Sequence, residues 1–495
     1  MKSYVLRCGW LCLLFAICVA VGLQANAQVA LTQLSQDNFT DQASQHLTEV
    51  EPGAFTYGST IVTAFQVARI YSGGGADIGF ATSKDGGATW SNGYLPGLTI
   101  YAGGNYTAAS DPVVAYDALH GVWLISTLPI GNSNITVAVS RSTDGINWSN
   151  PVFLNNSPSA DKNWIVCDNS ATSKYYGNCY QEWDDPDEGD LLLMSTSSDG
   201  GLTWSKAQTT MRQDYGIGGV PVVKLNGKVI VPFLGFNGYV QAFSSTNGGK
   251  TWKGAVNVGE FINHYENGDI RSAGLPSSGI DAAGNVWVAW SDCRFRTNCA
   301  ENDVVYSTSG GGAVWKAVQR VPIDGTTSTV DHFITGMAIQ PGTKGAKTHV
   351  GIAYYYYPVS NCTNCQLYVG FIQSLNKGKT WSTPVTLGGP MSLNWLPDTF
   401  SGRMVADYIA VGFGTGGKAF PIFSLASAPV GNLFQQAIYT TAAGLEAVGA
   451  EGEAQLSAAG DVPIQGAHSD HGPMEYLDQE HLIPVKGQRP PASRE

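Results

Sequence analysis

One short motif occurs six times along the chain and constrains the fold more than any other feature. The first copy, Ser83–Trp90, reads Ser-Lys-Asp-Gly-Gly-Ala-Thr-Trp, and later copies exchange Asp for Asn or gain or lose one residue. The copies end at Trp90, Trp148, Trp204, Trp252, Trp315 and Trp381, so they are 48 to 66 residues apart. A repeat of this period is typical of an array of four-stranded sheets.

The residues of the motif indicate a turn between two strands. Asp or Asn followed by Gly favours a turn, because the short polar side chain bonds nearby backbone and Gly accepts positive φ. Alternating apolar residues such as Ile78 and Phe80 precede the first copy and are typical of a strand. Recurrence of such hairpins predicts an all-β chain whose small sheets close into a β-propeller.

The motif resembles the Asp-box, or BNR repeat, of the sialidase superfamily. In that family the boxes lie on the outer rim of a β-propeller, away from the active site. The resemblance therefore implies that Asp85, Asp144 and Asp199 form turns and take no part in catalysis.

The two ends of the sequence differ from the repeated region. Lys2 and Arg7 precede an apolar run from Cys8 to Leu23, and Ala25-Asn-Ala27 follows, which predicts a secretory signal peptide cleaved before Gln28. We expect a signal peptide at 1–27, a propeller at 28–443 and a flexible tail at 444–495, where the strand pattern is lost. No later segment has the length and apolarity of a membrane span, so we expect a secreted monomer without membrane insertion.

Cysteine spacing agrees with an oxidising compartment. Six cysteines follow the leader in three close pairs: Cys167 with Cys179, Cys293 with Cys299, and Cys362 with Cys365. We predict three local disulfides. A zinc half-site at Cys362 and Cys365 is the alternative, but only one such pair exists and no His lies at ligand spacing. We therefore expect no metal and no cofactor.

The charge balance excludes some partners. Without the leader, 25 of the 27 lysines and arginines face 39 acidic residues, a net charge of −14. This argues against nucleic acid or an anionic membrane as the partner. It still allows a carbohydrate partner, including an anionic sugar held by a few arginines.

The number of blades is predicted from the six boxes and from the strands expected outside them. Six boxes account for six blades, and three more strands are expected after Trp381, at 404–413, 418–427 and 434–441. A strand at 29–34 could join them as a clasp and complete a seventh blade. Seven blades are predicted, with six, as in the sialidases of the family, as the alternative.

The resemblance suggests Arg69 as a site residue, but one arginine of the family's site is replaced by an acid in this sequence. Arg69 lies before the first box, where a sialidase arginine binds the sugar, although a structural ion pair is an equal reading. About twenty residues earlier the family carries Arg-Ile-Pro, but here Glu49-Val-Glu-Pro52 puts an acid in place of an arginine that clamps the sialic acid carboxylate. An acid there would repel that substrate, which counts against sialidase activity.

Four further segments carry candidate site residues. Asp161 and Trp164 lie beside a predicted disulfide. Asp161 could act as a catalytic acid, and Trp164 could stack on the face of a sugar ring. Glu266 and Arg271 have the residue types that sialidases use. His332 opens a strand that should line the channel. Arg403 and Tyr408 come late enough to stand for the third arginine and the tyrosine of the family.

The sequence thus predicts a secreted, sialidase-like glycoside hydrolase acting on terminal sugars of extracellular glycans. Asp161, Glu266 and Tyr408 are the predicted catalytic residues, and the predicted substrate-binding residues are Arg69, Trp164, Arg271, His332 and Arg403. Two alternatives stay open: a non-catalytic propeller that binds glycan or protein, and a polysaccharide lyase using His332 and a tyrosine. A hydrolase should place two carboxylates together at the channel mouth, whereas a binder should place aromatic residues there without such a pair.

Overall fold

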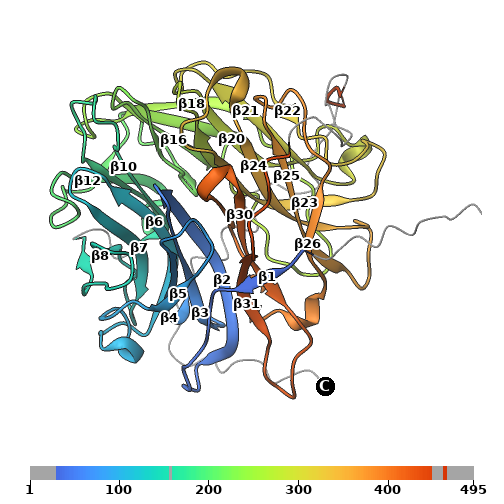
Figure 1. The fold of residues 1–495 in the computed structure, drawn as a ribbon, viewed down its shortest axis with the longest axis horizontal. Helices are drawn as coiled ribbons and strands as arrows, with labels where there is room; N and C mark the ends of the chain where they lie inside the picture. Colours follow the sequence, from blue (N-terminus) through green and yellow to red (C-terminus); the bar gives the residue numbers. More distant parts are fainter. Residues whose placement is uncertain (1–28, 155–158, 449–460, 465–495) are drawn as a thin grey trace, which may run out of the picture.

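The strands form successive groups that follow the chain order, with antiparallel pairing inside each group (Figure 1). Single pairings of β4 with β6 and of β2 with β31 join the first, second and last of these groups into one 12-stranded sheet. The computed structural model describes residues 29–154, 159–448 and 461–464. The predicted signal peptide and most of the predicted tail lie outside these residues. The first three groups are β2 (Ser44–Tyr57), β3 (Thr60–Ile70), β4 (Gly75–Ser83), β5 (Ser91–Tyr94); β6 (Ala108–Asp117), β7 (Val122–Ile130), β8 (Ala138–Ser142), β9 (Val152–Phe153); and β10 (Asp161–Cys167), β11 (Cys179–Asp185), β12 (Leu191–Ser197), β13 (Gln208–Thr209).

Four more groups complete the described part of the chain. They are β14 (Gly216–Ile217), β15 (Val222–Val223), β16 (Val229–Gly235), β17 (Tyr239–Ser245), β18 (Lys253–Glu260); β19 (Ser277–Ile280), β20 (Val286–Asp292), β21 (Asp303–Ser309), β22 (Gln319–Arg320); β23 (Asp331–Ile339), β24 (Val350–Tyr357), β25 (Gln366–Ser374), β26 (Val385–Ser392); and β29 (Ala410–Phe413), β30 (Ala419–Ala426), β31 (Gln436–Thr441) with β1 (Leu31–Gln33). A small hairpin, β27 (Asp398–Thr399) and β28 (Gly402–Arg403), precedes β29. Short 3-10 turns are η1 (Ile100–Ala102), η2 (Pro186–Glu188), η3 (Thr297–Cys299), η4 (Gly345–Lys347), η5 (Leu393–Trp395) and η6 (Thr415–Gly417).

Each copy of the repeated motif connects the last two strands of a group. In the first copy, the Ser83 hydroxyl donates to Asp85 Oδ1 at 2.8 Å, and the Thr89 amide donates to the same oxygen at 2.9 Å. Hydrogen bonds from Thr89 and Ser83 lower the pKa of Asp85 to about 2. The carboxylate is therefore used to hold the turn, as expected from the residue pattern.

The repeated turns also pack against the preceding group of strands. A Cβ on Gly249, where φ is +78°, would lie 2.2 Å from Thr196 Oγ1 of β12. A Cβ on Gly87 of the first copy would lie 2.2 Å from Phe420 of β30, in the last group. Glycine is thus needed at these turns both for positive φ and for close approach.

The last group of strands contains both ends of the described core. β1 pairs antiparallel with β31, with Leu31 opposite Thr441, so the N-terminal strand completes this group as the clasp requires. β29 begins at Ala410, later than the predicted start at 404, and Asp407 in the segment before it bonds to Lys162 and Arg271. The chain still contacts the sheets beyond residue 443, since Ala419 N donates to Leu445 O at 2.9 Å.

The first strands of the groups surround a common cavity of about 530 Å³. Its lining includes residues of β2, β6, β10, β15, β19, β23 and β29. The hydrophobic core lies between successive groups. For example, Leu192 and Met194 of β12 cluster with Val229 and Phe233 of β16. Each group thus contributes its first strand to the cavity wall, except the fourth, which contributes its second strand, β15.

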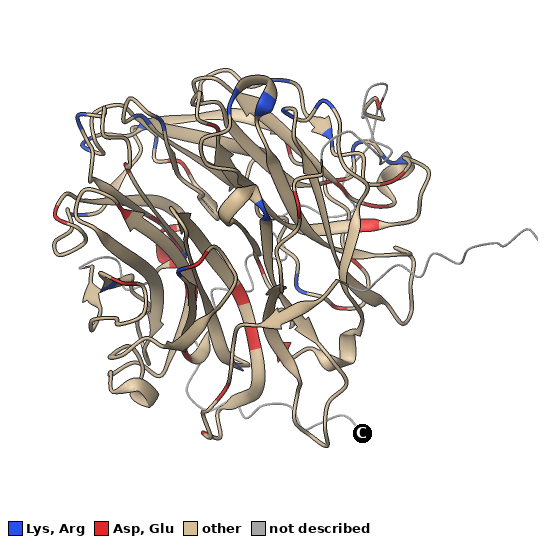
Figure 2. Ribbon diagram, viewed as in Figure 1, with Lys and Arg blue, Asp and Glu red and all other residues tan. Residues whose placement is uncertain are grey.

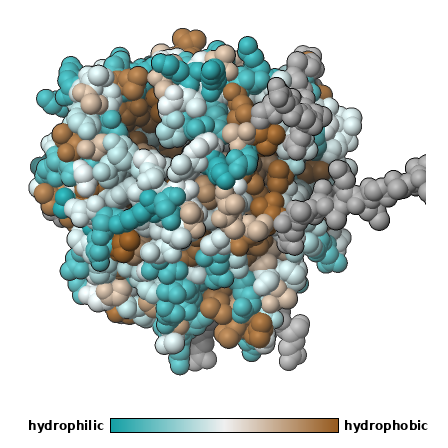
Figure 3. All heavy atoms as spheres, viewed as in Figure 1, coloured by the Kyte–Doolittle hydropathy of each residue, from teal (hydrophilic) through white to brown (hydrophobic). Residues whose placement is uncertain are grey.

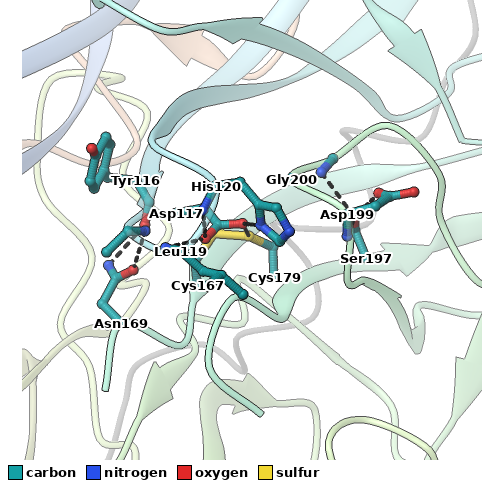
Figure 4. The surroundings of a disulfide bond; sticks show 12 residues. Tyr116, Asp117, Leu119, His120, Cys167, Asn169, Cys179, Ser197, Asp199 and Gly200 are labelled. Atoms are coloured by element: carbon teal, nitrogen blue, oxygen red, sulfur yellow. Dashed lines mark hydrogen bonds and ion pairs between the residues drawn. A yellow bond between two sulfur atoms is a disulfide. The ribbon is translucent and has the colours of Figure 1, made fainter. Parts of the chain in front are cut away.

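The predicted disulfides are confirmed at all three cysteine pairs. Cys167 and Cys179 are directly opposite each other on β10 and β11. Figure 4 shows Asp117 of β6 beside this disulfide, where its Oδ2 lies 2.6 Å from His120 Nδ1.

On the face shown in Figure 3, hydrophobic and hydrophilic residues are interspersed. Among the described residues, the structure contains no helix with the length and apolarity needed to cross a membrane.

Replacing Leu34 tests the clasp. Leu34 is buried, and its amide donates to Ile438 O at 2.7 Å. Leu34→Ala should lower the free energy of unfolding by about 2–5 kcal/mol, because it leaves a cavity between β1 and the last group. Urea unfolding measures the change. Leu202→Ala, at an exposed leucine, is the control and should stay within about 0.5 kcal/mol of the wild type. Equal effects of the two substitutions would contradict the role of the clasp.

Candidate functional site

Bulges in three neighbouring first strands bring charged residues to the centre. The strand register shifts at Val50/Gly53 in β2, at Ser110/Val113 in β6 and at Asp161/Trp164 in β10. Glu51, Asp111 and Lys162 lie in these bulges with φ of 55°, 48° and 45°. A bulge adds one residue to a strand and changes the direction of its side chain. The three bulges therefore release charged side chains from the regular in-out alternation of the strands.

Lys162 lies at the centre of a cluster of carboxylates. Its Nζ is 2.7 Å from Asp407 Oδ2, 3.8 Å from Asp111 Oδ2 and 4.0 Å from Asp161 Oδ1. The lysine side chain is 3% exposed, and that of Asp161 is 19% exposed. A buried ammonium group needs such compensation, since the loss of hydration is costly for an unpaired charge.

Arg271 binds Asp407 from a second side. Its Nε donates to Asp407 Oδ1 at 2.7 Å, its Nη2 donates to Oδ2, and its Nη1 donates to Ser401 Oγ at 3.2 Å. Burial alone would raise the pKa of Asp407, but Arg271 and Lys162 together hold it far below its usual range. Asp407 is therefore a buried anion shared by two cations.

Glu51 and Arg69 lie beside this cluster. Burial, followed by the charges of Asp111 and Asp407, raises the pKa of Glu51 well above its usual value. The Gln66 amide donates to Glu51 and, at 3.0 Å, to Ser110 Oγ. Burial lowers the pKa of Arg69 to about 10, which leaves it protonated, and its Nη1 donates to Gly74 O at 2.7 Å. Figure 2 shows acidic residues within β2, the strand that carries Glu51.

A surface pocket opens onto this cluster. Its volume is about 80 Å³, and its charged lining residues are Arg69, Asp111, Asp161, Lys162 and Arg271. The rest of the wall consists of serine, asparagine and glycine residues and of apolar residues, among them Leu128, Ile130 and Phe400. Two carboxyl groups from neighbouring strands thus line the pocket, next to three cations.

Three of the predicted site residues meet at this pocket: Arg69, Asp161 and Arg271. Trp164 and Tyr408 lie behind it, with ring centroids 5.5 Å apart, beside a smaller cavity that Asp111 and Lys162 also line. The Tyr408 hydroxyl donates to Pro112 O at 3.3 Å, and burial raises its pKa well above the usual value. In this state Tyr408 is a neutral phenol behind the pocket.

Glu266 and Arg403 lie outside the residues that line the pocket. Glu266 is held by Asn302, whose Nδ2 donates to its Oε1 at 3.0 Å. Arg403 donates from Nη1 to Leu393 O at 2.9 Å. Its main chain still supports the site, because Arg403 O accepts from Arg271 N at 2.9 Å.

His332 belongs to a separate charged cluster. Ligand atoms of His332, Asp303 and Asp324 lie within 4.8 Å of one another, which is close enough to consider a metal ion. However, Asp303 Oδ1 is 2.6 Å from Arg296 Nη2 and 2.9 Å from Arg320 Nη2. Two guanidinium groups already neutralise these carboxylates and would repel a metal cation. The cluster fits a structural ion network better than a metal site.

Asp407 is the central residue that the sequence reasoning did not select. It is the one charged residue in the expected strand at 404–413. A charge in a strand that should line the channel was the signal that could have identified it. The convergence of Asp111, Lys162 and Glu51 depends on the bulges, which no local pattern in the sequence indicates.

Comparisons with known proteins find weak structural similarity. No family model matches the sequence, and no curated protein matches it. The structure of the Hadza microbial sialidase Hz136 matches with 18% identity and a TM-score of 0.44, covering 63% of this chain and 64% of that one. A protein of unknown function from Dyadobacter fermentans matches with 15% identity and a TM-score of 0.45, covering 70% and 99%. The NanB sialidase of Streptococcus pneumoniae matches with 14% identity and a TM-score of 0.41, covering 84% and 71%.

The pH dependence of stability tests the environment of Glu266. Burial raises the pKa of Glu266 from 4.5 to about 8, so the folded protein holds this proton more tightly than the unfolded chain. The stability that Glu266 contributes is present below about pH 4.5 and is lost as the pH rises toward 8. Glu266→Gln stays neutral, and its stability relative to the wild type should increase between about pH 5 and pH 8.

Urea unfolding at the two pH values measures this difference. Glu188→Gln, at an exposed glutamate, is the matched control and should show little change. A Glu266→Gln variant whose stability relative to the wild type does not depend on pH would refute the raised pKa of Glu266.

Proposed function

We propose that the protein is a secreted glycoside hydrolase that acts on terminal sugars of extracellular glycans. In this proposal the seven strand groups are the blades of a seven-bladed propeller with Asp-box turns. The active site is the pocket formed by the bulges of the first three groups. The observation that carries the proposal is the presence of Asp111 and Asp161 in the wall of one pocket.

The separation of these carboxylates suits glycoside hydrolysis. One oxygen of each lies 3.8 and 4.0 Å from Lys162 Nζ, so these two oxygens are less than about 8 Å apart. Glycosidases use a carboxyl pair about 5–9.5 Å apart, one group protonating the leaving oxygen and the other acting as nucleophile or base. This limit allows both the retaining and the inverting geometry.

The depth of the two residues suggests their roles. Asp161 is the more exposed, and its strand partner across β11 is the buried Asp184. A leaving group departs toward solvent, so Asp161 is assigned as the proton donor. Asp111 is 3% exposed and receives a hydrogen bond from Ser110 Oγ at 2.5 Å. The deeper position suits the nucleophile or the base, and Lys162 would stabilise the charge that remains there.

Arg69 and Arg271 would then position the sugar from the pocket wall. Tyr408 is not assigned a covalent role, because its hydroxyl is bonded to Pro112 O and its pKa is raised. The lyase alternative is weaker, since His332 is 1% exposed and lies in the cluster with Arg296.

A non-catalytic, glycan-binding propeller is the second candidate. One specific observation favours it: both pocket carboxylates lie near the same ammonium group. Such pairing can hold a binding surface as well as it holds a catalytic one. Binding without turnover would identify this case.

A panel of fluorogenic glycosides, with a sialoside among them, tests the hydrolase proposal. The wild-type protein should hydrolyse at least one member. Asp161→Asn should lower kcat/KM by about 10²–10⁴-fold, because the general acid is lost. Asp187→Asn, at an exposed aspartate of η2, is the matched control and should retain its activity.

Two results would contradict the proposal. Full activity in Asp161→Asn would exclude that residue as the proton donor. A wild-type protein without turnover on any member would remove the hydrolase, and a glycan array would then test the binding alternative.

A further inference from the structure

We propose that Asp407 makes the pocket selective for uncharged sugars by neutralising, from within the protein, the cations that an acidic sugar would need. The inference rests on the proposed function in one respect, that the pocket receives a sugar. It concerns the class of that sugar and does not depend on whether the sugar is hydrolysed.

Asp407 engages two of the three cations in the pocket wall. Lys162 Nζ lies 2.7 Å from Asp407 Oδ2, and Arg271 binds both oxygens of the same carboxylate. The Nε and Nη2 donors form one of the two edges of a guanidinium group that can hold a carboxylate bidentately. In Arg271 a protein carboxylate takes this edge, so a ligand carboxylate would have to compete with it.

Lys162 has further protein carboxyl groups around it. Its Nζ also lies 3.8 Å from Asp111 Oδ2 and 4.0 Å from Asp161 Oδ1. Together with the contacts of Asp407, these groups surround the cations before a ligand enters. An anionic ligand would therefore have to compete with carboxyl groups of the protein for Lys162 and Arg271.

An acidic sugar would also meet repulsion at the pocket wall. Asp111 and Asp161 both line the pocket, and a carboxylate entering it would come close to at least one of them. Like charges brought together in a poorly solvated site disfavour binding. A ligand without charge avoids this repulsion.

The rest of the wall suits a neutral sugar. It contains hydroxyl and amide side chains, those of Ser72, Ser110, Asn134 and Ser159, and the peptide groups of Gly73 and Gly74. Phe400 adds an aromatic surface. Hydroxyl groups of a sugar can both donate to and accept from such groups, and an aromatic ring can pack against its C–H face.

Matched pairs of methyl glycosides provide the test. We would titrate the wild-type protein calorimetrically at pH 7 with methyl glucoside and methyl glucuronide, and with methyl galactoside and methyl galacturonide. The neutral member of at least one pair should bind about tenfold more tightly than its uronide, a difference of about 1.4 kcal/mol. Tighter binding of the uronide in either pair would overturn the proposal, and so would the absence of binding by all four compounds.

Variants at Asp407 test the cause of the selectivity. In Asp407→Asn the two cations lose their shared anion, so the preference for the neutral sugar should shrink by at least about tenfold. Asp398→Asn, at an exposed aspartate nearby in the sequence, is the control and should keep the wild-type preference. An unchanged preference in a folded Asp407→Asn variant would show that Asp407 does not set the selectivity.

A chemical rescue keeps the test open if the variants are unstable. Asp407→Ala leaves room for a small carboxylate between Lys162 and Arg271, so acetate should raise its Tm more than an equal concentration of chloride does. The wild-type Tm should not distinguish the two anions. Equal responses of the variant to acetate and chloride would contradict the proposed cation site.

The outcomes separate this inference from the proposed hydrolase. Preferential binding of neutral sugars without turnover on the glycoside panel would support the selectivity and reject the enzyme. Turnover of an acidic substrate with no preference for neutral sugars would support the enzyme and reject the selectivity.

Discussion

The buried ion pairs of Asp407 connect parts of the chain that no sheet connects. Lys162 belongs to β10, Arg271 to the segment between β18 and β19, and Asp407 to the segment before β29, so the contacts span 245 and 136 residues. Breaking a buried pair leaves an unpaired charge, which typically costs about 3–5 kcal/mol. The same interaction therefore supports the centre of the fold and fixes the charges that a ligand would meet.

The carboxylates that hold turns and those that line the pocket occur at different places in the sheets. Asp85 and Asp199 hold the outer turns by accepting hydrogen bonds from nearby hydroxyl and amide groups. Asp111 lies instead in a bulge of a first strand, at positive φ, where its side chain contacts the cluster around Lys162. Positive φ is unfavourable for a residue other than glycine. The surrounding strand pairing must offset this cost, which ties the geometry of the site to the packing of the whole sheet.

Glu51 illustrates how one position can change the character of a site. The resemblance places an arginine of the family where this chain has an acid, and here the acid is buried and its pKa is raised by burial. Arg69, close to it, is also fully buried and bonds to main-chain and amide oxygens. The charges that could have faced a ligand are used inside the protein, which is the physical basis for expecting a substrate without a carboxylate.

The sequence by itself determined the features that depend on neighbours along the chain. The motif spacing predicted repeated small sheets, close cysteine pairs predicted the disulfides, and the segment at 29–34 was identified as a strand that could join the last group. These follow from local turn chemistry and periodicity. The tertiary structure alone decided that Arg69, Asp161 and Arg271 share a pocket while Glu266, His332 and Arg403 do not. It also revealed Asp407, because a charge cluster assembled from bulged strands depends on register and on contacts between distant residues, which no local pattern specifies.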